Sequence, residues 1–109
     1  MIQRMLACIT LAVLMSTAHA VAPDIALQEL DSRPRNVNEI IGRDKWVIVV
    51  LWAHDCSICA SEIHRMNAFH ATHKDKDAIV LGVTIDGVAR LDLARRFAVT
   101  HKLQFMNLV

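Results

Sequence analysis

Residues 46–62 read WVIVVLWAHDCSICASE, a wholly apolar run followed four residues later by the first of two cysteines. The run over residues 46–52 has seven consecutive apolar residues, of which four are β-branched. Such a run is typical of a strand buried on both faces within a parallel sheet. The two tryptophans at its ends, Trp46 and Trp52, are expected to pack in the core or at its rim.

The sequence after this stretch predicts a helix and then a second strand–helix unit. Apolar side chains recur at helical spacing at Cys59, Ile63, Met66 and Phe69. This spacing predicts a helix over residues 57–73, with Met66 and Phe69 in the core. Three later elements are expected: a buried strand over 78–85, a helix with an apolar face over 88–101, and the start of a strand over 103–109. Alternating strands and helices form βαβ units, for which a parallel sheet is the default.

Upstream of the apolar run, the sequence predicts a small hairpin. Residues 24–30 are consistent with a short strand and residues 31–34 with a turn. Residues 36–41 then form either a second short strand or a helical turn. The fold class expected from all these elements is α/β, with the cysteines at the carboxyl end of a strand, where α/β sheets place their chemistry.

Residues 1–20 have the three-part pattern of a secretory signal peptide. Arg4 gives the positive start, an almost wholly apolar stretch follows, and Ala18-His19-Ala20 places small residues where signal peptidase needs them. The stretch is shorter than the roughly 20 residues of a membrane-spanning helix, so cleavage is expected and an uncleaved anchor is the alternative. Cys8 would be removed with it. The mature domain is then residues 21–109, exported to the periplasm.

The charge balance and the cysteine count exclude several classes of function. Residues 21–109 hold 11 basic and 11 acidic residues, because Arg4 is the one charged residue before them. No basic stripe favours nucleic acid, and no cationic amphipathic helix favours a membrane surface. In an oxidising compartment, Cys56 and Cys59 are expected to form a disulfide or a redox couple. A zinc ribbon would need a second pair of ligands, so no metal or other cofactor is expected.

The Cys-x-x-Cys spacing at a helix start has a direct chemical rationale. Unpaired N–H groups at a helix N-terminus can lower a cysteine pKa from about 8.5 to between roughly 3.5 and 7.5. Cys56 is therefore expected to be the nucleophile, and Cys59 the resolving thiol that attacks the mixed disulfide. The charge of Asp55 opposes a thiolate at Cys56. His54 either donates to that thiolate when protonated or is an ordinary loop histidine.

Glu62 is the third candidate for the chemistry. It lies three residues after Cys59, hence beside it on the predicted helix. A partly buried carboxyl group there would have a raised pKa and take the proton from Cys59 as this thiol attacks. The alternative is a surface glutamate paired with Arg65. The residues alone leave both interpretations open.

Residues 47–62 resemble the strand, the W-A-x-x-C-x-x-C motif and the following x-x-E of thioredoxin-like proteins, and most of all the exported TlpA/ResA-type thiol–disulfide oxidoreductases. The resemblance covers residues 25–109. It implies a thioredoxin-like fold that exchanges electrons with cysteines of exported proteins, often apocytochromes awaiting haem attachment, and a membrane thiol reductase or oxidase as electron partner. It also implies that Cys56 and Cys59 are the redox pair and that Glu62 is the acidic residue placed near them.

Four residues depart from this pattern. The sequence has Asp55 where these proteins usually have an aromatic residue, and Ile58 and His64 where they often have proline. Val50 stands where cytosolic thioredoxins keep a buried aspartate. The dipeptide between the cysteines tunes the redox potential over a wide range, and its Ser-Ile does not identify the direction of electron transfer.

The sequence also ends before the family's fold is complete. A thioredoxin fold continues through a cis-proline loop, two antiparallel strands and a closing helix. Here the prolines are Pro23 and Pro34, neither of which corresponds to that loop. We therefore expect a truncated fold, either a sequence fragment or a poorly stable domain, in which the strand over 46–52 forms an open edge that is prone to aggregation.

Two alternatives to an oxidoreductase remain. In the first, Cys56 and Cys59, helped by His54 or His64, bind a soft metal such as Cu(I). In the second, the chain is an inactive fragment and the cysteine pair is a structural disulfide. Stoichiometric Cu(I) binding by the reduced protein would indicate the first, and inertness to dithiol exchange would indicate the second.

Overall fold

The structure is a computed structural model that describes residues 21–109. The predicted signal peptide, residues 1–20, lies outside the described residues. Within residues 21–109, none of the helices combines the length and the apolar composition needed to cross a membrane.

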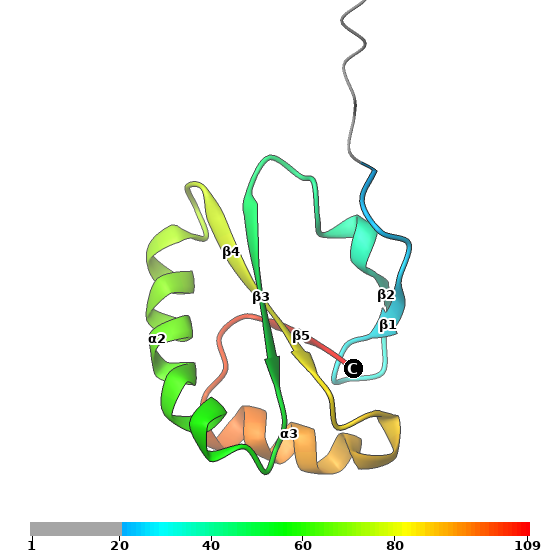
Figure 1. The fold of residues 1–109 in the computed structure, drawn as a ribbon, viewed down its shortest axis with the longest axis vertical. Helices are drawn as coiled ribbons and strands as arrows, with labels where there is room; N and C mark the ends of the chain where they lie inside the picture. Colours follow the sequence, from blue (N-terminus) through cyan, green and yellow to red (C-terminus); the bar gives the residue numbers. More distant parts are fainter. Residues whose placement is uncertain (1–20) are drawn as a thin grey trace, which may run out of the picture.

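The domain is an α/β arrangement of one parallel sheet, two α-helices and an N-terminal hairpin (Figure 1). Its elements in chain order are β1 (Ala26–Gln28), β2 (Pro34–Asn36), the 3₁₀ turn η1 (Val37–Glu39), β3 (Trp46–Trp52), α2 (Ser57–His73), β4 (Ala78–Thr84), the 3₁₀ turn η2 (Val88–Arg90), α3 (Leu91–Thr100) and β5 (Met106–Leu108). The sheet has the order β3-β4-β5 with both pairs parallel, which confirms the predicted βαβ arrangement.

The two faces of the sheet are covered by different parts of the chain. On one face, Ile63 of α2 packs against Val80 of β4 and against Phe105. On the other face, Val37 of η1 packs against Leu81 and Leu108. Figure 1 shows α2 along one side of the sheet and the β1–β2 hairpin on the opposite side, near the C-terminal end of the chain. Met66 and Phe69 of α2 are half-buried against this cluster of Ile63, Val80 and Phe105.

The prediction that β3 is buried on both faces is wrong. Ile48 is 37%, Val49 47% and Leu51 63% exposed. In the described part of the chain β3 pairs with β4 alone, so one edge of β3 is open, as the truncated fold predicted. Neither the hairpin nor α2 reaches far enough across the sheet to cover these side chains.

The two tryptophans at the ends of β3 have opposite environments. Trp52 is 1% exposed and stacks on Phe97 of α3, with ring centroids 4.7 Å apart. Trp46 is 81% exposed, so the expectation that it packs in the core or at its rim is wrong. The physical reason is its position: Trp46 begins the edge strand at the end of the sheet farther from α3.

Candidate functional site

Cys56 and Cys59 form a disulfide at the end of β3, with their Cα atoms 5.2 Å apart. Cys56 is the N-cap of α2, and its Sγ accepts a hydrogen bond from the backbone N of Cys59 at 3.1 Å. Its own backbone N donates to the carbonyl of Ala53 at 3.2 Å, which closes a tight turn after the strand. The Cys59 N–H in this first helical turn therefore points at the Cys56 sulfur, an arrangement that stabilises a thiolate.

The disulfide lies between an exposed dipeptide and an apolar part of the core. Both cysteines are half-buried, while Ser57 and Ile58 between them are exposed. Cys59 packs against the cluster that contains Trp52, Ala94 and Phe97. One wall of the disulfide is therefore apolar and fixed by α3, and the dipeptide between the cysteines lies open to a partner.

His54 is held in a hydrogen-bonded network that sequence reasoning missed. Its Nδ1 lies 2.6 Å from Asp86 Oδ1, and its backbone N donates to Asp86 Oδ2 at 3.0 Å. The Thr84 hydroxyl donates to the same Oδ2 at 2.7 Å, and the Asp86 side chain is only 2% exposed. His54 is therefore anchored to the end of β4, unlike an ordinary loop histidine.

The charge of Asp86 is favoured by this network. Burial acts to raise the pKa of Asp86, but hydrogen bonds from Thr84 and His54 outweigh it and hold the pKa below its usual value. The sequence carried one signal for this site. Asp86 follows a predicted parallel strand directly, and polar residues at the carboxyl ends of neighbouring strands meet at one edge of a sheet.

Glu62 lies on the solvent side of α2. Its side chain is 50% exposed, and Oε2 is 3.3 Å from Nη1 of Arg65. This is the ion pair described by the surface interpretation. Asp55 is exposed on the loop before Cys56.

Three groups that could ligate a metal converge at this loop. Potential ligand atoms of His54, Asp55 and Asp86 all lie within 4.8 Å of one another. The Asp86 carboxylate is, however, already occupied by Thr84 and by His54. Neither cysteine belongs to this cluster, and His64 lies further along α2, with its ring centroid 6.4 Å from that of His101.

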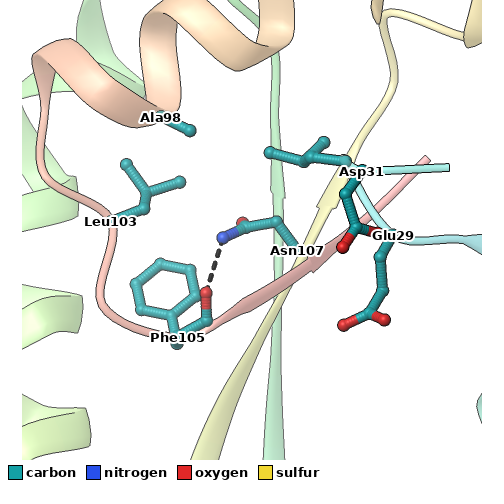
Figure 2. A pocket seen from close by; sticks show the side chains of 7 residues that line it. Glu29, Asp31, Ala98, Leu103, Phe105 and Asn107 are labelled. Atoms are coloured by element: carbon teal, nitrogen blue, oxygen red, sulfur yellow. Dashed lines mark hydrogen bonds between the residues drawn. The ribbon is translucent and has the colours of Figure 1, made fainter. Parts of the chain in front are cut away.

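A separate pocket lies between the β1–β2 turn, α3 and the segment that leads into β5 (Figure 2). Its volume is about 280 Å³, and it is lined by Glu29, Leu30, Asp31, Ala98, Leu103, Phe105 and Asn107. Asn107 donates to the carbonyl of Phe105 at 2.7 Å and accepts from Trp52 Nε1 at 2.9 Å. No cysteine lines this pocket, so it is distinct from the disulfide site.

Comparisons with known proteins agree with the geometry. The family described as AhpC/TSA matches residues 18–109. No curated protein gives a significant match to the sequence. The thioredoxin domain of a thiol-disulfide oxidoreductase from Bacteroides vulgatus has a TM-score of 0.70 at 25% identity, covering 82% of this chain and 61% of that one.

Two further solved structures are similar. A putative thiol:disulfide interchange protein DsbE from Chlorobium tepidum has a TM-score of 0.68 at 25% identity, covering 80% of this chain and 58% of that one. A secreted Mycobacterium tuberculosis disulfide oxidoreductase, described as homologous to E. coli DsbE, has a TM-score of 0.66 at 16% identity, with coverages of 78% and 59%. The chain thus spans about 60% of the length of these structures. The thioredoxin-like fold predicted from sequence is confirmed.

Proposed function

The chain belongs to the AhpC/TSA family, and from this we propose that it is a thiol–disulfide oxidoreductase that exchanges electrons with cysteines of exported proteins. The observation that carries the proposal is the Cys56–Cys59 disulfide at the N-terminus of α2. The fold is that of thiol–disulfide oxidoreductases. The pair begins four residues after the carboxyl end of β3, the edge strand of the parallel sheet. The activity of this chain and its partners are part of the proposal.

In the reducing direction, the Cys56 thiolate attacks one sulfur of a partner disulfide. A mixed disulfide forms, the partner's own S–S bond breaks, and the departing sulfur takes up a proton. Cys59 then loses its proton and attacks Cys56 Sγ, so the Cys56–Cys59 bond forms as the mixed disulfide breaks. The partner gains two electrons and two protons, and the protein is oxidised to its disulfide; oxidation of a partner uses the reverse steps.

The surroundings of the disulfide support different roles for the two sulfurs. The backbone N of Cys59 already donates to Cys56 Sγ, and this hydrogen bond strengthens when the sulfur is a thiolate. Cys59 lies against the apolar cluster of Trp52 and Phe97, where a neutral thiol is the favoured form. Cys56 is accordingly the proposed nucleophile and Cys59 the proposed resolving thiol.

Glu62 is retained as the proposed acceptor of the Cys59 proton. It follows Cys59 by three residues on α2, and its carboxylate is solvent-exposed. In the structure this carboxylate also pairs with the Arg65 guanidinium, at 3.3 Å. Replacing Glu62 is expected to slow resolution of the mixed disulfide rather than its formation.

We further propose a periplasmic location and exported partners. The support is the signal-peptide pattern of residues 1–20 and the similarity to a secreted disulfide oxidoreductase. Apocytochromes c are candidate partners, with a membrane thiol reductase or oxidase as the electron partner.

The test is the redox equilibrium of the purified chain with glutathione, read by mass shift after alkylation, in a Cys8→Ser background. A reversible two-electron couple between Cys56 and Cys59 is expected. Cys59→Ser should accumulate a mixed disulfide on Cys56, whereas Cys56→Ser should not accumulate one on Cys59. A disulfide that is inert to dithiols would instead indicate a structural bridge and would refute the proposal.

A further inference from the structure

A pocket of about 260 Å³ lies between the loop that precedes Cys56 and helix α3. Six residues line it: His54, Leu93, Arg96, Phe97, Thr100 and His101. Phe97 is buried and belongs to the core, whereas Arg96 and Thr100 are exposed. The pocket therefore combines an apolar inner wall with a polar rim.

The pocket and the disulfide share a wall. Phe97 lines the pocket and stacks on Trp52, and Cys59 packs against the same Trp52–Phe97 cluster. His54 lines the pocket from the other side and stands two residues before Cys56. The pocket therefore adjoins the disulfide through Phe97 and through the loop that precedes Cys56.

Arg96 supplies the one permanently charged group of the pocket, and its guanidinium can only donate hydrogen bonds. The pocket lining has a guanidinium, two imidazoles and a hydroxyl group, and it has no carboxylate. Among residues 21–109, the Arg96 guanidinium takes part in no hydrogen bond or ion pair. Asp92, one turn earlier on α3, pairs with Arg95 at 3.3 Å instead.

The acidic groups near His54 leave the Arg96 guanidinium available. Asp86 is buried and accepts a hydrogen bond from Nδ1 of His54, so its carboxylate is paired within the loop and is not available to Arg96. Asp55 is exposed on the loop and does not line the pocket. Arg96 and His101, both on the α3 side, face no acidic residue across it.

We propose that this pocket binds a carboxylate side chain of the partner protein, close in sequence to the cysteine that exchanges with Cys56. A guanidinium pairs with a carboxylate through two parallel hydrogen bonds, and the Thr100 hydroxyl supplies a further donor. The methylene groups of a glutamate or aspartate lie against Leu93 and Phe97. This inference deepens the proposed function by defining its substrate class, and it rests on that function for the exchange step.

Binding is tested first without any redox chemistry. The oxidised full chain is titrated with 3,3′-thiodipropionate, a dicarboxylate thioether, and with the neutral analogue 2,2′-thiodiethanol, while amide and imidazole NMR shifts are followed. Saturable shifts at Arg96, Thr100 and His101 are expected with the dicarboxylate alone. Arg96→Gln should weaken this binding by roughly two- to fivefold, the loss of one exposed charge-assisted contact.

Exchange is tested next with paired peptide disulfides that carry either Glu or Gln two residues from the cysteine. The ratio of the Glu to the Gln rate constant is expected to fall about fivefold in Arg96→Gln. Arg90→Gln is the matched control, because Arg90 precedes α3, is exposed and does not line the pocket. It removes the same charge and should leave the ratio unchanged.

The outcomes separate this proposal from the proposed function. Exchange with the Gln peptide but no preference for Glu, together with absent thiodipropionate shifts, overturns the pocket and leaves the oxidoreductase function standing. No exchange with either peptide overturns the function, and the thiodipropionate titration still decides whether the pocket binds carboxylates. Equal ratio changes in Arg96→Gln and Arg90→Gln indicate long-range charge alone and overturn the pocket. Glutathione disulfide carries carboxylates on a small molecule. If Arg96→Gln slows exchange with glutathione disulfide but the Glu and Gln peptides exchange at equal rates, the carboxylate does not come from a partner protein.

Discussion

Strands β3 and β4 have the same length and similar apolar sequences, yet the fold treats them differently. β4 lies between β3 and β5 and carries the core residues Val80 and Leu81. β3 lies at the edge, and Val49 and Leu51 remain exposed on it. An apolar run thus shows that a strand can be buried, and the number of neighbouring elements decides how many of its side chains are buried.

The largest difference between the two strands in the stability lost on substitution is expected at Gly82 of β4. A Cβ atom there would lie 1.9 Å from Oδ1 of Asn107, which must then move and release Trp52 Nε1. Gly82→Ala combines overpacking with a lost buried hydrogen bond, so about 4 kcal/mol of destabilisation is expected. Urea unfolding measures it. Val49→Ala on β3 is the control, and equal losses for the two variants would contradict the comparison.

A matched leucine pair gives the next largest effect. Leu81→Ala removes a side chain that is 1% exposed and leaves a cavity, which should cost about 3 kcal/mol. Leu51→Ala, at 63% exposed, should cost less than about 1 kcal/mol. Both values come from urea unfolding of the same chain. A cost at Leu51 close to that at Leu81 would mean that β3 is covered in solution by something beyond residues 21–109.

Asp86 connects the end of β4 to the loop that follows β3, so its loss should uncouple the two strands. Since the folded pKa of Asp86 lies below 3.8, the ionised carboxylate favours the folded state. This contribution is complete above pH 3.8 and is lost as the pH falls through the lower folded value. Asp86→Asn should cost about 2 kcal/mol at pH 7 and reduce the loss of stability on acidification.

Unfolding curves of wild type and Asp86→Asn between pH 2 and 7 measure this difference. Asp92→Asn, which changes an exposed acid on α3, is the control and should keep the wild-type pH dependence. Parallel wild-type and Asp86→Asn curves over this range would show that the carboxylate contributes nothing specific.

The smallest effect concerns the way α2 is attached to β4. His70 Nδ1 accepts a hydrogen bond from the backbone N of Val80 at 3.1 Å, so the ring must be neutral there. Burial, and then Lys74, lower the pKa of His70 below 6.5, although Asp75 acts in the opposite direction. The contribution to stability is complete above pH 6.5 and is lost as the pH falls below it.

His70→Gln should therefore reduce the loss of stability between pH 7 and 5 by up to about 1 kcal/mol. Thermal unfolding at both pH values measures this. His64→Gln, which changes an exposed histidine of the same helix, should behave as wild type. If the His70 and His64 variants respond to pH alike, the bond to Val80 does not sense protonation.

The local elements were predictable because their signals are local. The apolar run gave β3 over its full length, and the helical spacing of Ile63 and Phe69 gave α2 with its observed bounds. The Cys-x-x-Cys spacing allowed the disulfide, since one helical turn brings the two sulfurs together. The catalytic roles of Cys56, Cys59 and Glu62 remain predictions.

Features that depend on contacts distant in sequence were not predictable in this way. The exposure of Trp46 and the burial of Trp52 follow from where α3 lies, which a pattern along one strand does not encode. The anchoring of His54 by Asp86 depends on parallel pairing that sets Trp52 opposite Thr84. Neither residue has a motif of its own, because each is defined by its partner.

The sequence by itself determined the order of the elements, the parallel βαβ topology and the position of the cysteine pair at a helix start. Periodicity and residue spacing act over a few residues, and these features need nothing more. The tertiary structure alone decided how much of β3 is covered, which acid holds His54 and that His54 and Arg96 line one pocket. These depend on packing between segments separated by 30 or more residues, such as His54 and Asp86, and that packing is set by the whole core.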